Sequence, residues 1–254
     1  MSAWLDPLRA ALDEAAAPVT FFFRDDDAGW ADAELVALLD VFAARDVPLD
    51  AAAIPLAVRD GLVAELVARC EAGTGLAVHQ HGYAHLDHEL GAGRRCEFGP
   101  HRARADQLAD LAHGQAILRE QFGPLLQPIF TPPWNRCTAA TGDCLVELGV
   151  AALSRDRSAG RLDLRGLAEL PICVDWLKTV KPTGRRRTRA ELGEVLAERA
   201  WEGAPVGVML HHAVMDAADR GGVDELLALL ANHPGARCRS MTALLALSPE
   251  ETPA

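Results

Sequence analysis

Two groups of potential metal ligands occur in this chain of 254 residues. One is the acidic run Asp25-Asp26-Asp27, and the other is the segment from His79 to His85, which holds three of the nine histidines. Adjacent carboxylates repel one another, so an ordered acidic run usually needs a cation or a well-solvated loop. Neutral imidazoles are common ligands of borderline metals such as zinc. Together, the two groups predict a metal site.

The histidine spacing favours one pair as ligands. His81 and His85 are four residues apart and can reach one ion from a helical turn or a tight loop, whereas the spacing of His79 from His81 suits a strand. Gly82 stands where the HExxH motif of zinc proteases has its glutamate, so the segment is a different type of site. Two imidazoles and one carboxylate leave open coordination positions, as a catalytic zinc site requires. The same ligand set also occurs in mononuclear iron oxygenases, which leaves an iron enzyme as an alternative.

Three further polar groups follow apolar runs. His211-His212 comes directly after Val206–Leu210, and the segments 131–136 and 173–176 each place a tryptophan beside polar residues. An exposed tryptophan face suits stacking against a sugar ring or another flat surface. Taken singly, such tryptophans are better explained as part of an ordinary core.

These groups belong to a chain in which strand-like runs alternate with helical patterns. The strands are expected at 19–23, 49–54, 76–79, 128–131, 150–154, 169–176 and 206–210. The helices are expected at 32–45, 60–72, 102–121, 139–148, 188–202 and 222–232, after an amphipathic N-terminal helix. Thr188 and Glu191 form a capping box at the start of the fifth helix.

The alternation predicts an α/β fold in which helices cover a parallel sheet, as a barrel or a doubly wound sheet. The polar groups then lie at the carboxyl ends of strands, the edge where such folds place their sites. With no repeat and no low-complexity linker, residues 1–254 are expected to form a single domain.

Composition excludes several classes of function. The formal net charge of −11 argues against general affinity for nucleic acid or an anionic membrane surface. No apolar run approaches the roughly 18 residues needed to span a bilayer, and no signal peptide is recognisable, so a cytoplasmic protein is expected. The six cysteines lack the spacing of a disulfide scaffold and are expected to be reduced. The oligomeric state stays open.

Taken in order, the segments resemble the motif set of the polysaccharide deacetylase family, the carbohydrate esterases with the chitooligosaccharide deacetylase homology domain. That family has a TFDDG-like motif, H-x-x-x-H, R-x-P-aromatic, an Asp/Trp segment and an LHD-like motif. The matching segments are RDDDAG (24–29), HGYAH (81–85), TPPWNR (131–136), CVDW (173–176) and MLHH (209–212).

The resemblance implies a distorted (β/α) barrel with about seven parallel strands and one divalent metal ion, usually zinc. By position, Asp27, His81 and His85 match the metal ligands. Asp26 matches the catalytic base, and His211 matches the general acid.

The third and fourth motifs supply the remaining candidates. Trp134 matches the position whose backbone N–H helps to bind the oxyanion, and Pro133 and Arg136 accompany it as candidate substrate residues. Asp175 and Trp176 are the candidates from the fourth motif.

The acidic run allows two registers. Asp25 and Asp26 could replace Asp26 and Asp27 as base and ligand. We prefer Asp26 as the base and Asp27 as the ligand because Ala28-Gly29 follows this pair, as a small residue does in the family's motif.

Two other positions depart from the family pattern. Thr131 stands where the family has an arginine that orients the base, so Arg136 or Arg24 could take that role. His212 is an alternative to His211 as the acid, although His211 directly follows the apolar strand.

The resemblance implies a metal-dependent hydrolase that removes acetyl groups from N-acetylated sugars or polysaccharides. An amidase of the same fold, acting on a small cyclic amide or acetylated amine, is the main alternative. A binding module with a decayed site is a further one, although such a module needs neither Asp26 nor His211.

Overall fold

The computed structural model describes residues 2–89 and 93–247, which divide into two compact units. Unit 1 contains the described residues up to Asp25, residues 33–49 and those from Ile172 onward, and unit 2 contains residues 26–32 and 50–171. The single-domain organisation expected for residues 1–254 stays a prediction.

Unit 2 is built on parallel strands in the order β6-β5-β4-β3-β2. These are β2 (Leu49–Ala53, within the unit from Asp50), β3 (Leu76–His81), β4 (Leu126–Thr131), β5 (Ala152–Leu153) and β6 (Ala168–Glu169). In β3 and β4, His81 is aligned with Thr131. The carboxyl end of β3 therefore places its last histidine beside the last residue of β4.

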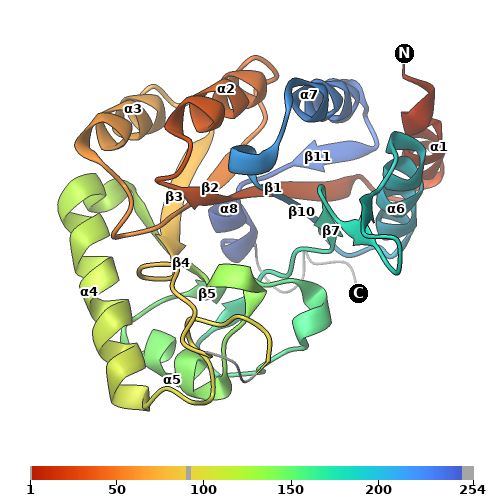
Figure 1. Cartoon of the computed structure of the whole chain (residues 1–254). Helices are drawn as coiled ribbons and strands as arrows, with labels where there is room; N and C mark the ends of the chain where they lie inside the picture. Colours follow the sequence, from red (N-terminus) through yellow and green to blue (C-terminus); the bar gives the residue numbers. More distant parts are fainter. Residues whose placement is uncertain (1, 90–92, 248–254) are drawn as a thin grey trace. The chain divides into compact units, whose positions relative to one another are not determined.

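Three helices of unit 2 connect its strands: α3 (Asp60–Glu71), α4 (Arg104–Phe122) and α5 (Ala139–Glu147). Figure 1 shows α5 near the start of α4, and the two helices are in contact. Thr138 and Thr141 form a capping box that begins α5. The core between helices and strands contains Phe98 and Phe130, whose rings meet edge to face with centroids 5.6 Å apart.

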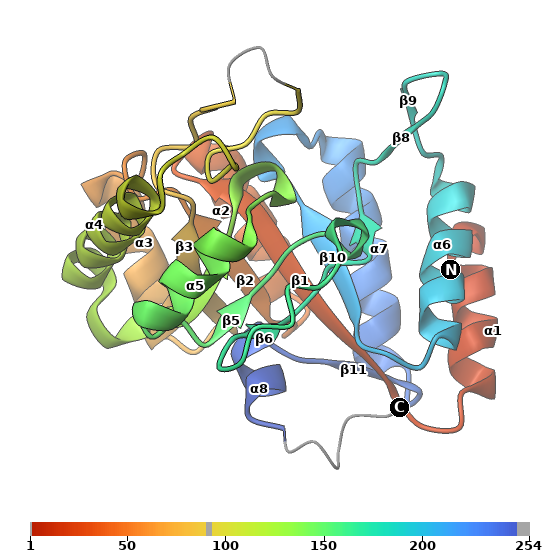
Figure 2. The same cartoon turned by 90° about the horizontal axis from the view of Figure 1, so that it is seen from below.

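In unit 1, strand β1 (Val19–Ala28) pairs in parallel with β10 (Val206–Leu210) and with β11 (Ala236–Cys238), and β10 pairs with β7 (Val174–Asp175). Asp25 is aligned with Leu210 in this register. A separate antiparallel pair, β8 (Thr179–Val180) and β9 (Arg185–Arg186), precedes α6 (Figure 2).

The helices of unit 1 are α1 (Asp6–Glu14), α2 (Asp32–Ala43, within the unit from Ala33), α6 (Arg189–Trp201), α7 (Ala217–Asn232) and α8 (Met241–Leu245). Helices α1 and α6 lie side by side in both views (Figures 1 and 2). The capping box of Thr188 and Glu191 begins α6, as predicted.

The predicted start of the last long helix, at residue 222, is wrong. Asp216 caps α7 by accepting a hydrogen bond from the Asp219 N–H, so the helix begins at Ala217. Gly221 and Gly222 lie inside the helix instead of in a loop. A Cβ at Gly222 would stand 2.0 Å from the guanidinium carbon of Arg189, which is the far end of a flexible side chain.

The predicted fold class, α/β with parallel strands in a distorted (β/α) barrel, is confirmed. The sequence suggested that the acidic run follows the first strand. Strand β1 extends to Ala28, so the acidic run instead belongs to the strand. Within residues 2–89 and 93–247, no helix is long and apolar enough to cross a membrane. The cytoplasmic location stays a prediction.

Candidate metal centre

The predicted ligands meet in unit 2. One ligand atom from each of Asp27, His81 and His85 lies within 4.8 Å of the other two. The Nε2 atoms of His81 and His85 are 3.1 Å and 3.2 Å from the same carboxylate oxygen, Oδ1 of Asp27. The side chains of His81 and His85 are 1% and 10% exposed, and that of Asp27 is 14% exposed, so the cluster is shielded but reachable.

The protonation of His81 indicates that this cluster fits a cation. Its Nδ1 lies 3.0 Å from the carbonyl oxygen of Thr131, which can only accept, so Nδ1 carries the proton. When this ring is neutral, the lone pair of Nε2 points at the Asp27 carboxylate. Two electron-rich atoms so placed repel each other unless a positive charge lies against both, and His85 repeats the arrangement on the same oxygen. Two imidazole nitrogens and one carboxylate oxygen suit a divalent ion such as zinc.

Two of the three ligands have a left-handed backbone. The φ angle is 70° at Asp27 and 57° at His85. A non-glycine residue in this region costs on the order of 1–3 kcal/mol and persists where the surroundings fix it, frequently at functional sites. Asp27 and His85 are thus two of the seven described non-glycine residues with a positive φ, and His81 is not one of them.

A buried glutamate holds the loop between the two histidines. Glu97 is 0% exposed, and its carboxylate accepts hydrogen bonds from the backbone N–H groups of Tyr83 (3.1 Å), Ala84 (2.8 Å) and Leu86 (3.3 Å). His85 lies within this clamped segment. Sequence reasoning missed Glu97 because its partners are backbone groups, which leave no pattern of side chains to detect.

Gly82 allows the loop to pass close to its neighbours. Its φ is 57°, and a Cβ there would stand 2.2 Å from Oε2 of Glu97 and 2.6 Å from Cγ of Pro133. Pro133, a predicted substrate residue, is buried and packs against this turn. Steric crowding therefore explains why position 82, where the HExxH motif has its glutamate, holds a glycine.

Two tryptophans flank His85. The ring centroids of Trp30 and Trp134 lie 4.7 Å and 4.5 Å from that of His85, both in edge-on arrangements. Trp134 was predicted from the third motif, and its φ of 55° is also left-handed. Trp30, which is 41% exposed, was missed, although it stands just three residues after Asp27. Both indole rings therefore contact the same candidate metal ligand.

Thr131 supports both buried histidines of β3. Its hydroxyl lies 2.8 Å from Nε2 of His79, and its carbonyl binds His81 as described above. The position that holds an arginine in the family pattern therefore orients imidazoles here. Arg136 lies elsewhere, donating from Nη1 to the carbonyl oxygen of Arg95 at 2.7 Å.

The candidates for proton transfer lie in different units. Asp26 is 2% exposed and belongs to unit 2, whereas His211 is half-buried and belongs to unit 1. In unit 1 the buried Asp25 accepts hydrogen bonds from the backbone N–H of His212 (3.0 Å) and from its Nδ1 (2.5 Å). Asp25 and His212 are thus engaged with each other, and the assignment of the base to Asp26 and of the acid to His211 stays a prediction.

The remaining predicted residues lie in unit 1. Asp175 accepts a hydrogen bond from the Leu177 N–H at 3.0 Å. Trp176 is 4% exposed, meets Trp4 edge to face, and lies under the guanidinium of Arg189 at 5.0 Å. Their roles toward substrate stay predictions.

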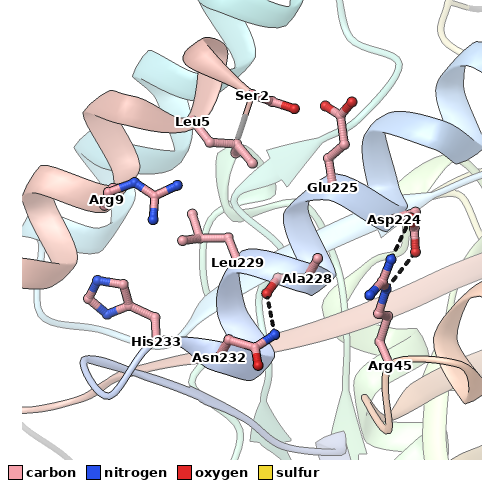
Figure 3. Close-up of a pocket in the computed structure, with 10 residues that line it drawn as sticks. All are labelled: Ser2, Leu5, Arg9, Arg45, Asp224, Glu225, Ala228, Leu229, Asn232 and His233. Atoms are coloured by element: carbon pink, nitrogen blue, oxygen red, sulfur yellow. Dashed lines mark hydrogen bonds and ion pairs between the residues drawn. The ribbon is translucent and has the colours of Figure 1, made fainter.

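A cavity of about 320 Å³ in unit 1 contains none of the predicted site residues (Figure 3). Arg45 and Asp224 on its wall form a two-point ion pair at 2.7 Å and 2.8 Å, and Asn232 donates to the carbonyl of Ala228. Because these polar groups satisfy one another, nothing in the lining points to a particular ligand.

All six cysteines are free. Two of them lie in the segments around the metal-ligand loop: Cys96 donates from Sγ to the carbonyl of Arg136, and Cys137 forms a β-bridge with Phe98. Burial raises the pKa of Cys96 and raises that of Cys137 to about 12.

No protein-family model matches the chain, and no curated protein sequence matches it. Solved structures do match over most of its length. A protein from Mycobacterium smegmatis that carries the polysaccharide deacetylase name is 17% identical, with 91% of this chain and 90% of that chain covered and a TM-score of 0.67.

Two further structures are similar to the chain. A family 4 acetyl xylan esterase from Clostridium thermocellum, in complex with a cobalt ion, is 12% identical, with 89% of each chain covered and a TM-score of 0.59. A family 4 pseudoenzyme from Bacillus anthracis is 13% identical, with 90% of this chain and 66% of that chain covered and a TM-score of 0.56. The described parts of the chain therefore have the fold of the polysaccharide deacetylases and family 4 carbohydrate esterases.

Proposed function

We propose that the protein is a metal-dependent deacetylase that hydrolyses the amide bond of N-acetylated sugars or polysaccharides. Asp27, His81 and His85 hold one divalent ion, with zinc as the expected metal. The observation that carries this proposal is the direction of two imidazole Nε2 atoms onto one carboxylate oxygen, with Nδ1 of His81 already committed to a carbonyl. The fold and the cobalt ion in a structure of the same fold support it.

The residues divide the proton transfers of amide hydrolysis. A divalent ion at this site supplies Lewis acidity, which polarises a carbonyl and makes water more acidic. Asp26 accepts the proton of the attacking water, and His211 donates a proton to the leaving amine, which is otherwise too basic to depart. The backbone N–H near Trp134 donates to the developing oxyanion.

The strand register supports this division of roles. Asp25 and Leu210 are aligned in β1 and β10. Asp26 and His211 each follow a member of that aligned pair by one peptide bond. We assign the base to Asp26 and the acid to His211, as the order of the motifs implies.

The test measures bound metal and turnover together. The protein is purified with zinc, and hydrolysis of N-acetylated sugars, acetylated amines and cyclic amides is followed with and without a chelator. We expect acetate release that the chelator abolishes and that zinc or cobalt restores. We expect Asp27→Asn to lose both the metal and the activity, because it removes the anionic ligand.

Variants of the proton-transfer residues separate binding from chemistry. Asp26→Asn and His211→Ala should keep the metal and the folded state and lose at least about 100-fold in rate. An unchanged rate in either variant would refute its role. A chain that binds metal but hydrolyses none of these compounds would resemble the pseudoenzyme and refute the proposed activity.

A further inference from the structure

One arginine, Arg95, lies beside a tryptophan that borders the metal centre. The guanidinium carbon of Arg95 lies 5.5 Å from the centroid of the Trp134 ring, which in turn meets His85. Arg136 binds the Arg95 carbonyl, and this contact holds the Arg95 backbone next to the third-motif segment. The cationic group is thus two ring contacts away from a metal ligand.

The carboxylate of Asp87 lies near the arginine cluster (Arg94, Arg95 and Arg136), because the charge of Arg95 acts to lower the pKa of Asp87 and the charge of Asp87 acts to raise that of Arg136. Arg94 and Arg95 are exposed, and neither forms an ion pair with any described residue. The pKa of Arg136 is lowered, first by burial and then by the charge of Arg94, which is the signature of crowded cations. The nearby carboxylate of Asp87 is engaged by the backbone N–H groups of residues 89 and 96.

The loop that carries the cluster is built to hold its position. Asp87 accepts a hydrogen bond from the Cys96 N–H on this segment, and Glu97, which follows Cys96, accepts from the Ala84 N–H on the metal-ligand turn. In a chain with a net charge of −11, a set of unpaired arginines on a braced loop is a local exception. Arginines of this kind typically bind carboxylate or phosphate oxygens through paired N–H groups.

We propose that Arg94 and Arg95, with the Trp134 face, form a subsite for an anionic group of the substrate, so that the preferred substrate is an acylated amine carrying a carboxylate or a phosphate. This inference rests on the proposed function, because it places the anion next to the group that is hydrolysed. Arg136 is a positioning residue that supports Arg95.

Matched substrates test the subsite. N-acetylglucosamine, N-acetylglucosaminuronic acid and N-acetylglucosamine 6-phosphate differ only at C6, and N-acetylglycine and N-acetylglycinamide form a smaller pair. With the zinc-loaded protein, we expect kcat/KM for the anionic members to exceed that for their neutral partners by about tenfold, the value of one charge-assisted contact. The two C6 anions decide between carboxylate and phosphate. The preference should weaken as salt is raised.

The double variant R94Q/R95Q should remove the preference and leave the rate for neutral members within about twofold. Arg119→Gln, which removes an exposed arginine from α4, is the matched control and should keep the preference. Equal rates for charged and neutral members in the wild type, or a preference that survives in R94Q/R95Q, would overturn the subsite.

Binding separates this inference from the proposed activity. Calorimetric titration with the same compounds measures the subsite even if no compound is hydrolysed. Anion binding that depends on Arg94 and Arg95 without turnover would support the subsite and refute the deacetylase. Turnover without any preference for charged substrates would support the deacetylase and refute the subsite.

Discussion

At the residue scale, Glu97 is the group that most controls the metal centre without touching it. A buried carboxylate is costly unless hydrogen bonds compensate its charge. Three backbone N–H groups do so here, and all three belong to the segment around His85. Such charge-assisted bonds are stronger than neutral ones, so the turn is fixed before any metal arrives.

We expect Glu97→Gln to weaken zinc binding by about 10- to 100-fold, the usual effect of losing an outer-sphere partner. The amide has one acceptor oxygen, and its NH₂ group faces N–H groups that it cannot serve. Competition with a chromophoric chelator measures the affinity. Glu120→Gln, on the exposed side of α4, is the control and should bind zinc like the wild type. Equal affinity in both variants would show that the clamp does not position His85.

The sequence was sufficient to predict Asp27, His81 and His85, because the types of these side chains and their positions along the chain can be read directly from it. The structure brings these three together. The sequence could not reveal Glu97, whose partners are backbone groups, or Trp30, whose neighbour His85 is remote in sequence. Contacts of this kind depend on the path of a loop, which side-chain patterns do not specify.

At the element scale, the turn after β3 depends on a glycine for two separate reasons. Gly82 has a positive φ and lacks room for a Cβ. Gly73 provides a natural comparison, because its φ is +70° but no atom would lie within 4 Å of its Cβ.

We expect Gly73→Ala to lower the free energy of unfolding by about 1–2 kcal/mol, the cost of a left-handed alanine. Gly82→Ala should cost clearly more and should also weaken zinc binding, because Glu97 or Pro133 must move. Denaturant titration with and without zinc measures both effects. Equal losses in the two variants would mean that the close packing at Gly82 is easily relieved.

The same scale shows where sequence prediction of elements succeeds. Periodicity and capping boxes located most helices to within two residues, as at α3 and α6. The start of α7 was missed because Gly221 and Gly222 suggested a loop, whereas the capping box of Asp216 and Asp219 begins the helix before them. The two-residue strands β8 and β9 are too short to leave a periodic signal.

At the scale of the whole molecule, the chain passes from one unit to the other four times. One passage lies inside β1, between Asp25 and Asp26, where no linker separates the units. All three metal ligands belong to unit 2.

We therefore expect calorimetry to show one unfolding transition for the whole chain, as a single domain requires. Zinc should move that transition upward, since a ligand at 100 times its Kd stabilises by about 2.7 kcal/mol. Asp27→Asn should abolish the shift. Two transitions, of which zinc moves only one, would contradict the single-domain prediction.

The buried thiols have a practical consequence for such experiments. A sulfur that keeps its proton at neutral pH is a weak nucleophile and reacts slowly with peroxide or alkylating agents. Cys137, with its pKa of about 12, and Cys96 are of this kind. These two thiols, which lie near the metal centre, therefore need no protection by dithiol reductants, which would compete for the ion whose binding is to be measured.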